Sequence, residues 1–101
     1  MIPAEEAVLI MVLTAYAPKC GATGLTRAQT TPQVGITAAA DLKVLPLGSR
    51  VEIEGLGVRH VHDSGRLVKG HHLDLYVSTC KEARTFGRQK RRVKIVHIPR
   101  R

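Results

Sequence analysis

Two aspartates, Asp63 and Asp74, lie in settings that suit proton-transfer chemistry. Asp74 stands between Leu73 and Leu75 in a segment that alternates apolar and polar residues, eleven positions after Asp63. Alternation along a strand predicts that Asp74 projects from the face opposite the two leucines. A carboxylate in mid-strand is costly unless it is paired, hydrogen-bonded or protonated. Next to another carboxylate and out of water, such a group has a raised proton affinity and can act as a general acid.

On spacing alone, a structural interpretation of both residues is favoured over the catalytic one. Asp63 precedes Ser64-Gly65 and suits a turn former that accepts backbone N–H bonds. Asp74 suits an ion pair with Lys69 or an arginine. If residues 58–63 and 73–77 are neighbouring strands, their glycine-containing connection brings the two aspartates side by side.

Short strands are predicted to position these carboxylates. The apolar or alternating segments are Val8–Tyr16 (closed by Pro18), Arg50–Glu54, Val58–Asp63, Leu73–Val77 and Lys94–Ile98. Between the first two, residues 19–37 are rich in Gly, Thr and Pro and are predicted to form a long ordered loop. The fold class indicated is all-β: a small closed barrel with one short helix.

That helix is predicted over Lys81–Phe86. Thr79 supplies an N-cap hydroxyl and Glu82 follows three residues later, which matches a capping box. Gly87 suits the left-handed position that ends a helix.

Composition limits the chain to one domain, residues 1–101, with a core of aliphatic residues. It has 101 residues, 44% of them hydrophobic, with two Tyr, one Phe and no Trp. The net charge of +8 suits a polyanionic partner, but no aromatic residues are interleaved with the basic C-terminal end as single-stranded nucleic acid requires. We therefore predict no nucleic-acid partner; an anionic cell wall or a solvated basic face explains the charge.

Cysteines, histidines and the N-terminus add further expectations. Cys20 and Cys80 match no metal spacing, and they are either a disulfide of an exported protein or two buried thiols. The apolar segment Ala7–Leu13 is too short to span a bilayer and is preceded by acidic residues, so it is predicted as a strand rather than a signal peptide. Four histidines resemble a metal site in type and spacing: His60, His62, His71 and His72. We predict no metal, because the last two lie in a glycine-rich turn.

Several short motifs together resemble the 3D domain family, named for its three aspartates. They begin with Thr14-Ala15-Tyr16, Gly35 to Asp41 and Leu45 to Val51, and continue with Asp63-Ser64-Gly65, Val68-Lys69-Gly70, Leu73 to Tyr76 and Glu82 to Gly87. The resemblance covers about residues 12–96. It implies a six-stranded double-psi β-barrel, similar to the catalytic domain of membrane-bound lytic transglycosylase A and to stationary-phase-survival muralytic enzymes.

The resemblance also implies a function and a set of residues. Those enzymes cleave the β-1,4 bond between N-acetylmuramic acid and N-acetylglucosamine without water, leave a 1,6-anhydro end and need no cofactor. Asp74 takes the place of their catalytic acid, with Asp63 and Asp41 as supporting carboxylates. Substrate contacts are expected from Tyr16, Ser64, Lys69 and Tyr76; the structural alternatives are a core position for either tyrosine and an exposed turn for Lys69. The partner is the glycan strand of peptidoglycan, and the setting is extracytoplasmic, secreted or cell-wall associated.

Departures from the family pattern, and one alternative function, remain. Leu42 follows Asp41 where the family commonly has Pro, and serines occupy positions 49 and 64 where Thr is usual. His62, directly before Asp63, is unusual and is expected to favour the ionised aspartate. The alternative to an enzyme is a non-catalytic barrel that binds cell-wall carbohydrate.

Overall fold

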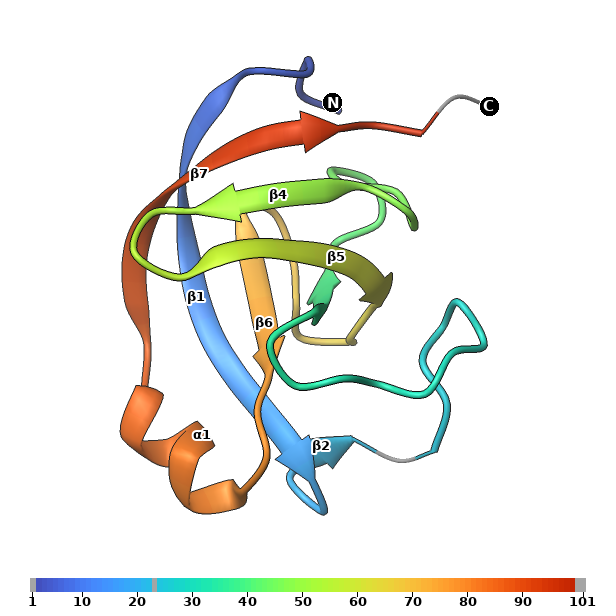
Figure 1. Ribbon diagram of the computed structural model, residues 1–101, viewed down its shortest axis with the longest axis vertical. Helices are drawn as coiled ribbons and strands as arrows, with labels where there is room; N and C mark the ends of the chain where they lie inside the picture. Colours follow the sequence, from blue (N-terminus) through green and yellow to red (C-terminus); the bar gives the residue numbers. More distant parts are fainter. Residues whose placement is uncertain (1, 23, 100–101) are drawn as a thin grey trace.

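The computed structural model describes residues 2–22 and 24–99. Within them the elements in chain order are β1 (Val8–Pro18), β2 (Gly21–Ala22), β3 (Thr37–Ala40), β4 (Arg50–Ile53), β5 (Gly57–Asp63), β6 (His72–Tyr76), α1 (Cys80–Phe86) and β7 (Gln89–His97). Both ends of the described chain lie at one end of the molecule, and β2 and α1 lie at the other (Figure 1).

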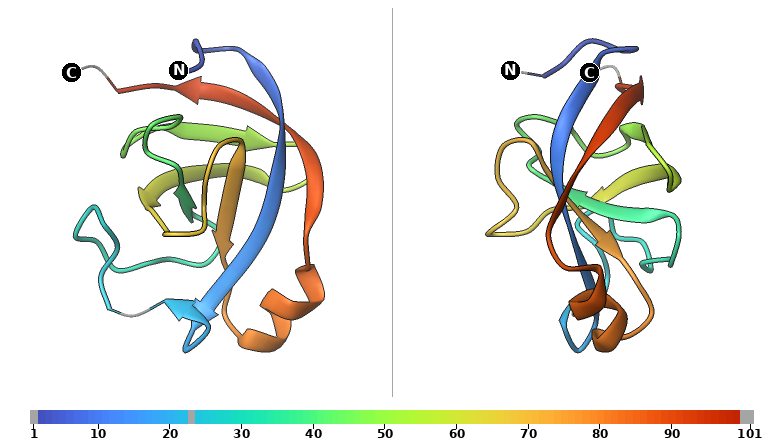
Figure 2. Two further views of the ribbon diagram at one scale, coloured as in Figure 1. Left: turned by 180° about the vertical axis from the view of Figure 1, so that it is seen from behind. Right: turned by 90° about the vertical axis from the view of Figure 1, so that its left-hand side faces the viewer.

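Six of these strands close into a barrel. The hydrogen-bonded order is β2-β1-β6-β3-β5-β4-β7, and an additional β1–β7 pairing joins the ends of the ring, leaving β2 as an appendage of β1. The β1–β6 and β3–β5 pairs are parallel, and the other four pairs of the ring are antiparallel. The side view in Figure 2 shows β1 and β7 crossing as they twist about each other. The predicted six-stranded barrel with one short helix is confirmed.

Alternation along the strands divides the barrel into a core and an outer face. Leu73 and Leu75 of β6 are 0% and 3% exposed and pack inside, whereas Asp74 between them projects outward, as predicted. The other buried members of the core cluster are Met11, Leu13, Ala38, Ala40, Leu45, Val51, Ile53, Val61, Val93 and Ile95. Each large aliphatic side chain removed from water contributes roughly 1.5–3 kcal/mol to folding, so this interior holds the strands that carry the site.

A second, smaller cluster lies outside the main core. It consists of Tyr16, Ala39 and Val68, with Ala22 and Tyr76 packed against it. Ala39 belongs to it because side chains alternate along β3, and its neighbours Ala38 and Ala40 point into the barrel. This cluster forms the apolar base beneath the aspartates described below.

The strands differ from prediction in one arrangement that concerns the site. The direct pairing of β5 with β6, which was the condition stated for bringing the two aspartates together, is not formed. Instead β3 lies between them and pairs with both. Residues 37–40 are Thr37 followed by three alanines. Alanine is not a residue type that indicates a strand, so the sequence pattern did not predict β3. His72, expected in a turn, is the first residue of β6, and β7 begins at Gln89 rather than Lys94.

Helix α1 begins at Cys80, one residue before the predicted start, and ends at Phe86 as predicted; its N-cap is the expected Thr79, whereas the conformation of Gly87 after its end differs. The Thr79 hydroxyl accepts a hydrogen bond from the Glu82 N–H at 3.0 Å, and the Glu82 carboxylate lies 3.3 Å from that hydroxyl. Gly87 has a φ of 67° with a ψ of −142°, which lies outside the left-handed helical region expected there. Its N–H still bonds the Ala83 carbonyl at 3.3 Å, so the last turn is closed.

A disulfide settles the alternative left open for the cysteines. Cys20 and Cys80 are bonded, with Cα atoms 5.6 Å apart and 60 positions between them. The bond joins the turn between β1 and β2 to the first residue of α1. It therefore ties the start of the long loop to the helix at the far end of the barrel.

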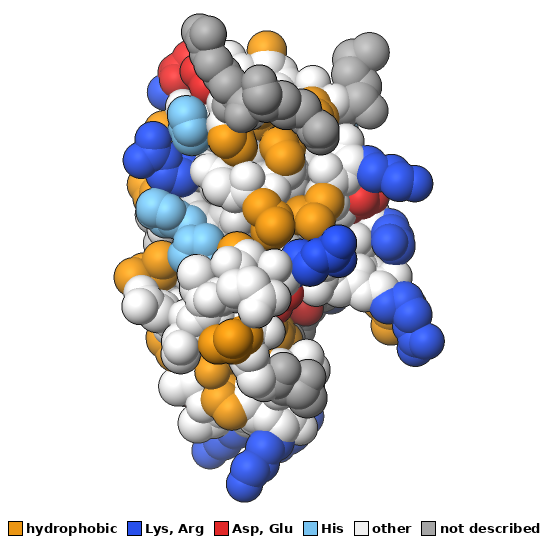
Figure 3. Space-filling model, turned by 90° about the vertical axis from the view of Figure 1, so that its right-hand side faces the viewer, with side chains coloured by type: hydrophobic (Ala, Val, Ile, Leu, Met, Phe, Trp, Pro, Cys, Tyr) orange, Lys and Arg blue, Asp and Glu red, His pale blue; other side chains and the backbone are white. Residues whose placement is uncertain are grey.

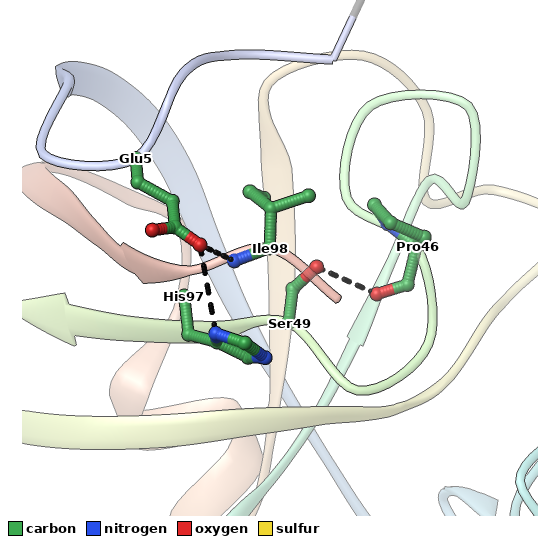
Figure 4. A network of polar contacts seen from close by, with 5 residues as sticks. All are labelled: Glu5, Pro46, Ser49, His97 and Ile98. Atoms are coloured by element: carbon green, nitrogen blue, oxygen red, sulfur yellow. Dashed lines mark hydrogen bonds and ion pairs between the residues drawn. The ribbon is translucent and has the colours of Figure 1, made fainter. Parts of the chain in front are cut away.

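Polar contacts fix the opposite end (Figure 4). The Glu5 carboxylate accepts a hydrogen bond from the Ile98 N–H at 3.0 Å and lies 3.5 Å from His97 Nδ1. The Ser49 hydroxyl is fully buried and donates to the Pro46 carbonyl at 2.7 Å. Ser49 thus stabilises a turn at this end of the barrel.

Candidate active site

Asp63 and Asp74 flank the same residue of β3. Ala39 pairs with Asp63 across the parallel β3–β5 contact and with Asp74 across the antiparallel β3–β6 contact. Residues paired across a sheet project from the same face, so both carboxylates stand over the small Ala39 side chain. The structure thus brings them together on the outer face of the barrel through the shared neighbour β3, and not through a direct β5–β6 pairing. We call Asp63, Asp74, Thr14, Tyr16 and His72 the carboxylate face.

Thr14 of β1 holds the Asp74 carboxyl group. The two residues are paired in the β1–β6 register, and the Thr14 hydroxyl donates to Asp74 Oδ1 at 2.8 Å. Burial is the largest influence on the pKa of Asp74 and raises it above its ordinary value. The Thr14 hydrogen bond and the charge of His72 oppose that rise, and the nearby Asp63 adds to it. The result is a carboxyl group whose protonated form persists to higher pH than that of an exposed aspartate.

His72 is the histidine that meets the carboxylate face. Its Nε2 atom lies 2.8 Å from the Thr14 hydroxyl, which connects it to Asp74 through one oxygen. Burial lowers the pKa of His72, and the charge of Asp74 only partly offsets this. The neutral imidazole is therefore favoured near neutral pH.

Asp63 is held by three donors. Its Oδ1 atom accepts from the N–H groups of Arg27 at 3.0 Å and Ser64 at 2.9 Å, and its Oδ2 atom accepts from the Tyr16 hydroxyl at 3.2 Å. Burial, and then the charge of Asp63, raise the pKa of Tyr16, so its phenol keeps its proton and donates. The predicted turn-former role of Asp63 is correct, and it coexists with a position beside Asp74.

The turn after Asp63 requires glycine at its centre. A Cβ atom on Gly65 would lie 2.8 Å from the Val68 side chain, which is a member of the apolar base. The Val68 N–H bonds the Gly65 carbonyl at 3.1 Å, closing the turn. Gly65 therefore allows the chain to leave β5 while Val68 packs beneath the carboxylate face.

Asp41 has a separate position. Its Oδ1 atom accepts from the Lys43 N–H at 3.1 Å and its Oδ2 atom from the Gly70 N–H at 2.9 Å. These two backbone bonds, the Gly70 one first, lower the pKa of Asp41, so it is an anion that joins the segment after β3 to the turn before β6. Asp41 is not among the groups that influence the pKa of Asp74. The predicted trio is thus a pair plus one carboxylate that organises neighbouring turns.

The remaining predicted site residues divide between two neighbouring places. Tyr76 is half-buried on β6 and packs edge-on against Tyr16, with ring centroids 5.3 Å apart. Ser64 and Lys69 line a cavity of about 480 Å³ next to Asp63, together with Asp41, Arg27, Lys43, Arg66, Ala40, Leu42, Gly65 and Val68. We call it the basic cavity, because four of its side chains are cations. Figure 3 views this side of the molecule, where basic side chains project around a hollow with acidic ones between them.

The other histidines do not join the aspartates. The rings of His60 and His62 lie 5.6 Å apart on one face of β5, as predicted. His62 Nδ1 lies 3.2 Å from the Thr37 hydroxyl, and burial lowers the pKa of His62. No group of three or more His, Cys, Asp or Glu residues in the described ranges is arranged to hold a metal ion. Among the groups that shift the pKa of Asp74, the histidine is His72.

Sequence reasoning missed three participants. Thr14 and His72 contact Asp74 directly or through one atom, and Arg27 contributes its backbone N–H to Asp63. Thr14 and Tyr16 alternate on one face of β1. Once β1 is known to pair with β6, this spacing places Thr14 beside Asp74. The Arg27 N–H is a backbone group of a loop, and no side-chain pattern announces such a donor.

Comparison with known proteins identifies the family. The sequence model described as the 3D domain matches residues 36–98. This chain belongs to the 3D domain family. The family match spans β3 to β7 and includes all three aspartates, whereas β1, with Thr14 and Tyr16, lies outside it.

Two relatives in Bacillus subtilis and one solved structure are similar to the chain. The cell wall-binding protein YocH is 36% identical over 59 residues, which are 58% of this chain and 21% of that protein. YabE, whose name refers to cell wall shaping, is 30% identical over 95 residues, or 89% of this chain and 23% of that protein. The chain thus spans about a fifth of the length of each relative. The crystal structure of MltA from E. coli shares the fold, with a TM-score of 0.61 and 18% identity over 74% of this chain and 28% of that one.

Proposed function

We propose that this domain binds the glycan strands of peptidoglycan on the carboxylate face and cleaves them as a lytic transglycosylase. The observation that carries the proposal is the pairing of half-buried Asp74, whose pKa is raised, with Asp63 across Ala39. Membership of the 3D domain family and the cell-wall names of two relatives support a cell-wall substrate. The bond cleaved would be the β-1,4 bond between N-acetylmuramic acid and N-acetylglucosamine.

In this mechanism Asp74 acts first as acid and then as base. Its proton passes to the glycosidic oxygen as the bond from that oxygen to the anomeric carbon breaks. The C6 hydroxyl of the muramic residue then attacks the anomeric carbon and gives its proton to the Asp74 carboxylate. A 1,6-anhydro ring forms, the leaving sugar gains a hydroxyl, and Asp74 is protonated again. Because the substrate supplies the nucleophile, the reaction uses no water and no second activating base.

The surrounding groups have supporting roles in the proposal. Asp63, fixed by three donors, provides a negative charge that stabilises the oxocarbenium-like transition state. The Thr14 hydroxyl orients the Asp74 carboxyl group, and the lowered pKa of His72 makes that imidazole a weaker competitor for the Asp74 proton. Tyr76 offers a half-buried aromatic ring for sugar contact, and Ser64 and Lys69 lie beside the bound strand.

An exported setting is part of the proposal. Disulfides form and persist in oxidising compartments, and the Cys20–Cys80 bond suits such a location. The names of the relatives agree with a place at the cell wall. Within the described residues, no helix has the length and apolar character needed to cross a membrane.

A non-catalytic role as a cell-wall-binding barrel is the second candidate. The observation that favours it is that one relative is named a cell wall-binding protein. Binding alone would need the carboxylate face and its neighbouring cavity as contact surfaces, but not a proton on Asp74.

One experiment separates the two candidates. Purified murein is incubated with the parent protein, with Asp74→Asn, and with Glu52→Gln as a control for loss of an exposed carboxylate. Soluble products are analysed by mass spectrometry and bound protein by co-sedimentation. Anhydro muropeptides from the parent and the control, but not from Asp74→Asn, support the lyase. Reducing ends indicate a hydrolase, and co-sedimentation of all three proteins without any product indicates a binding module.

A further inference from the structure

The basic cavity next to the carboxylate face holds cations that form no ion pair with any carboxylate of residues 2–22 and 24–99. Its four cationic side chains, Arg27, Lys43, Arg66 and Lys69, are all exposed. Within the described residues the ion pairs are Lys94–Glu6 and His97–Glu5, so none of the four is neutralised by a carboxylate in contact. Like charges gathered without counter-charges repel one another, and an anionic ligand would relieve that repulsion.

The one carboxylate in the cavity serves to build it. Asp41 uses one oxygen for the Lys43 N–H and the other for the Gly70 N–H. It thereby fixes the segment that carries Lys43 and the turn that carries Lys69, so their side chains line the same cavity. With Asp41 engaged by the backbone, the cavity remains positive by four cations to one anion.

The cavity also adjoins the proposed reaction site. The Arg27 and Ser64 backbone N–H groups bind Asp63, and both residues line the cavity. A strand whose scissile bond lies at Asp74 would therefore place a substituent of a nearby sugar in the cavity. Its volume of about 480 Å³ falls within the range of small-molecule sites, roughly 300–1,000 Å³.

The chemistry of the substrate class then identifies the ligand. The sugar rings of peptidoglycan are neutral, and its strands carry their carboxylates on the peptide stem, which is joined by an amide bond to the lactyl group of muramic acid. Where the stem is removed, the lactyl group itself becomes a carboxylate. We propose that the basic cavity binds the carboxylates of the peptide stem and selects glycan strands that carry it. This inference rests on the proposed function and extends it from the sugar chain to its peptide substituent.

The test measures binding with and without the cavity cations. The double variant Lys43→Gln/Arg66→Gln removes two exposed cations, and Lys90→Gln/Arg92→Gln removes two exposed cations of β7 as a matched control. Both are made in the Asp74→Asn background, so that strands are not consumed. Three probes are titrated by calorimetry at low and physiological salt: uncross-linked strands with intact stems, the same strands stripped by an amidase so that only lactyl carboxylates remain, and uncharged chitohexaose.

The expected result is selective. The cavity variant should bind stem-bearing strands about tenfold more weakly, the order expected for losing charge-assisted hydrogen bonds, with chitohexaose binding unchanged. The β7 control should behave as its background. If the loss is as large for stripped strands, the cavity does not distinguish the stem carboxylates from the lactyl carboxylate, and the stem proposal is overturned.

Other outcomes overturn the proposal. Equal weakening for all three probes, or the same loss in the β7 control, would mean that the cavity has no specific anion site. Equal affinity of the Asp74→Asn background for all three probes would refute the stem inference while leaving glycan binding intact. Absence of binding to every probe would instead refute the proposed function itself.

Discussion

Removing the Cys20–Cys80 disulfide should destabilise the domain strongly, because the bond closes a long loop in the unfolded chain. The double variant Cys20→Ser/Cys80→Ser is the perturbation. The bond spans 60 positions, and loop-closure entropy for that length amounts to about 14 cal/mol/K, or about 4 kcal/mol at 25 °C. Domains of this size have total stabilities of roughly 5–15 kcal/mol, so the loss is a large fraction of the whole.

The assay is urea unfolding followed by circular dichroism, with thermal unfolding as a second measure. An unfolding entropy of roughly 2.1 cal/mol/K per residue converts the loss into a Tm lower by about 20 °C. The parent protein treated with a reductant should shift toward the variant, which controls for the serine substitutions. Activity should fall at temperatures where the variant begins to unfold, since the bond anchors the start of the loop that carries Arg27 to Asp63.

Two results together would refute the reasoning. The free energy of unfolding of the variant would lie within about 1 kcal/mol of that of the parent, and the reduced parent would unfold at the same urea concentration as the oxidised parent. That result would mean that the unfolded chain is already confined without the bond, so that closing the loop gains nothing.

Three further predictions concern the site and the core. Asp74→Asn should raise the free energy of unfolding at pH 7, because the pKa of Asp74 is raised in the folded state and its ionisation costs stability as pH rises through that value. The gain should vanish below about pH 4, where the carboxyl group is protonated in both the folded and the unfolded state. A gain that persists at pH 3 would contradict this. Thr14→Val should lower the rate of anhydro-product release about ten- to a hundredfold, as expected for a hydrogen bond to a charged group, and should move the alkaline limb of the pH profile to higher pH because a bond that lowers the pKa of Asp74 is lost. Thr14→Ser should restore both, and failure to do so would show that the methyl group matters instead. Leu73→Ala should cost about 2–5 kcal/mol in urea unfolding because Leu73 is 0% exposed, whereas Leu67→Ala, at a residue 80% exposed, should stay within about 0.5 kcal/mol.

The sequence by itself determined the outward position of Asp74. Its leucine neighbours must enter a core, and side chains alternate along a strand, so the face was decided locally. The N-cap of α1 was readable for the same reason, since Thr79 and Glu82 interact within one turn. The small barrel followed from the number of short strands, and the family resemblance specified six.

Only the tertiary structure decided how the carboxylates meet. Local patterns contain no information about which strands are neighbours, and a run of small residues hid β3, which stands between Asp63 and Asp74. The Cys20–Cys80 pairing depended in the same way on where the chain returns after 60 positions.

Long-range pairing also assigned the partners of the two aspartates. The β1–β6 register placed Thr14 against Asp74 and brought His72 within reach, so the histidine beside the acid is not the sequence neighbour of Asp63. Asp41 was separated from the pair because its oxygens bind the backbone of two turns. The sequence thus supplied the chemical groups and their faces, while contacts between distant segments determined which groups act on one another.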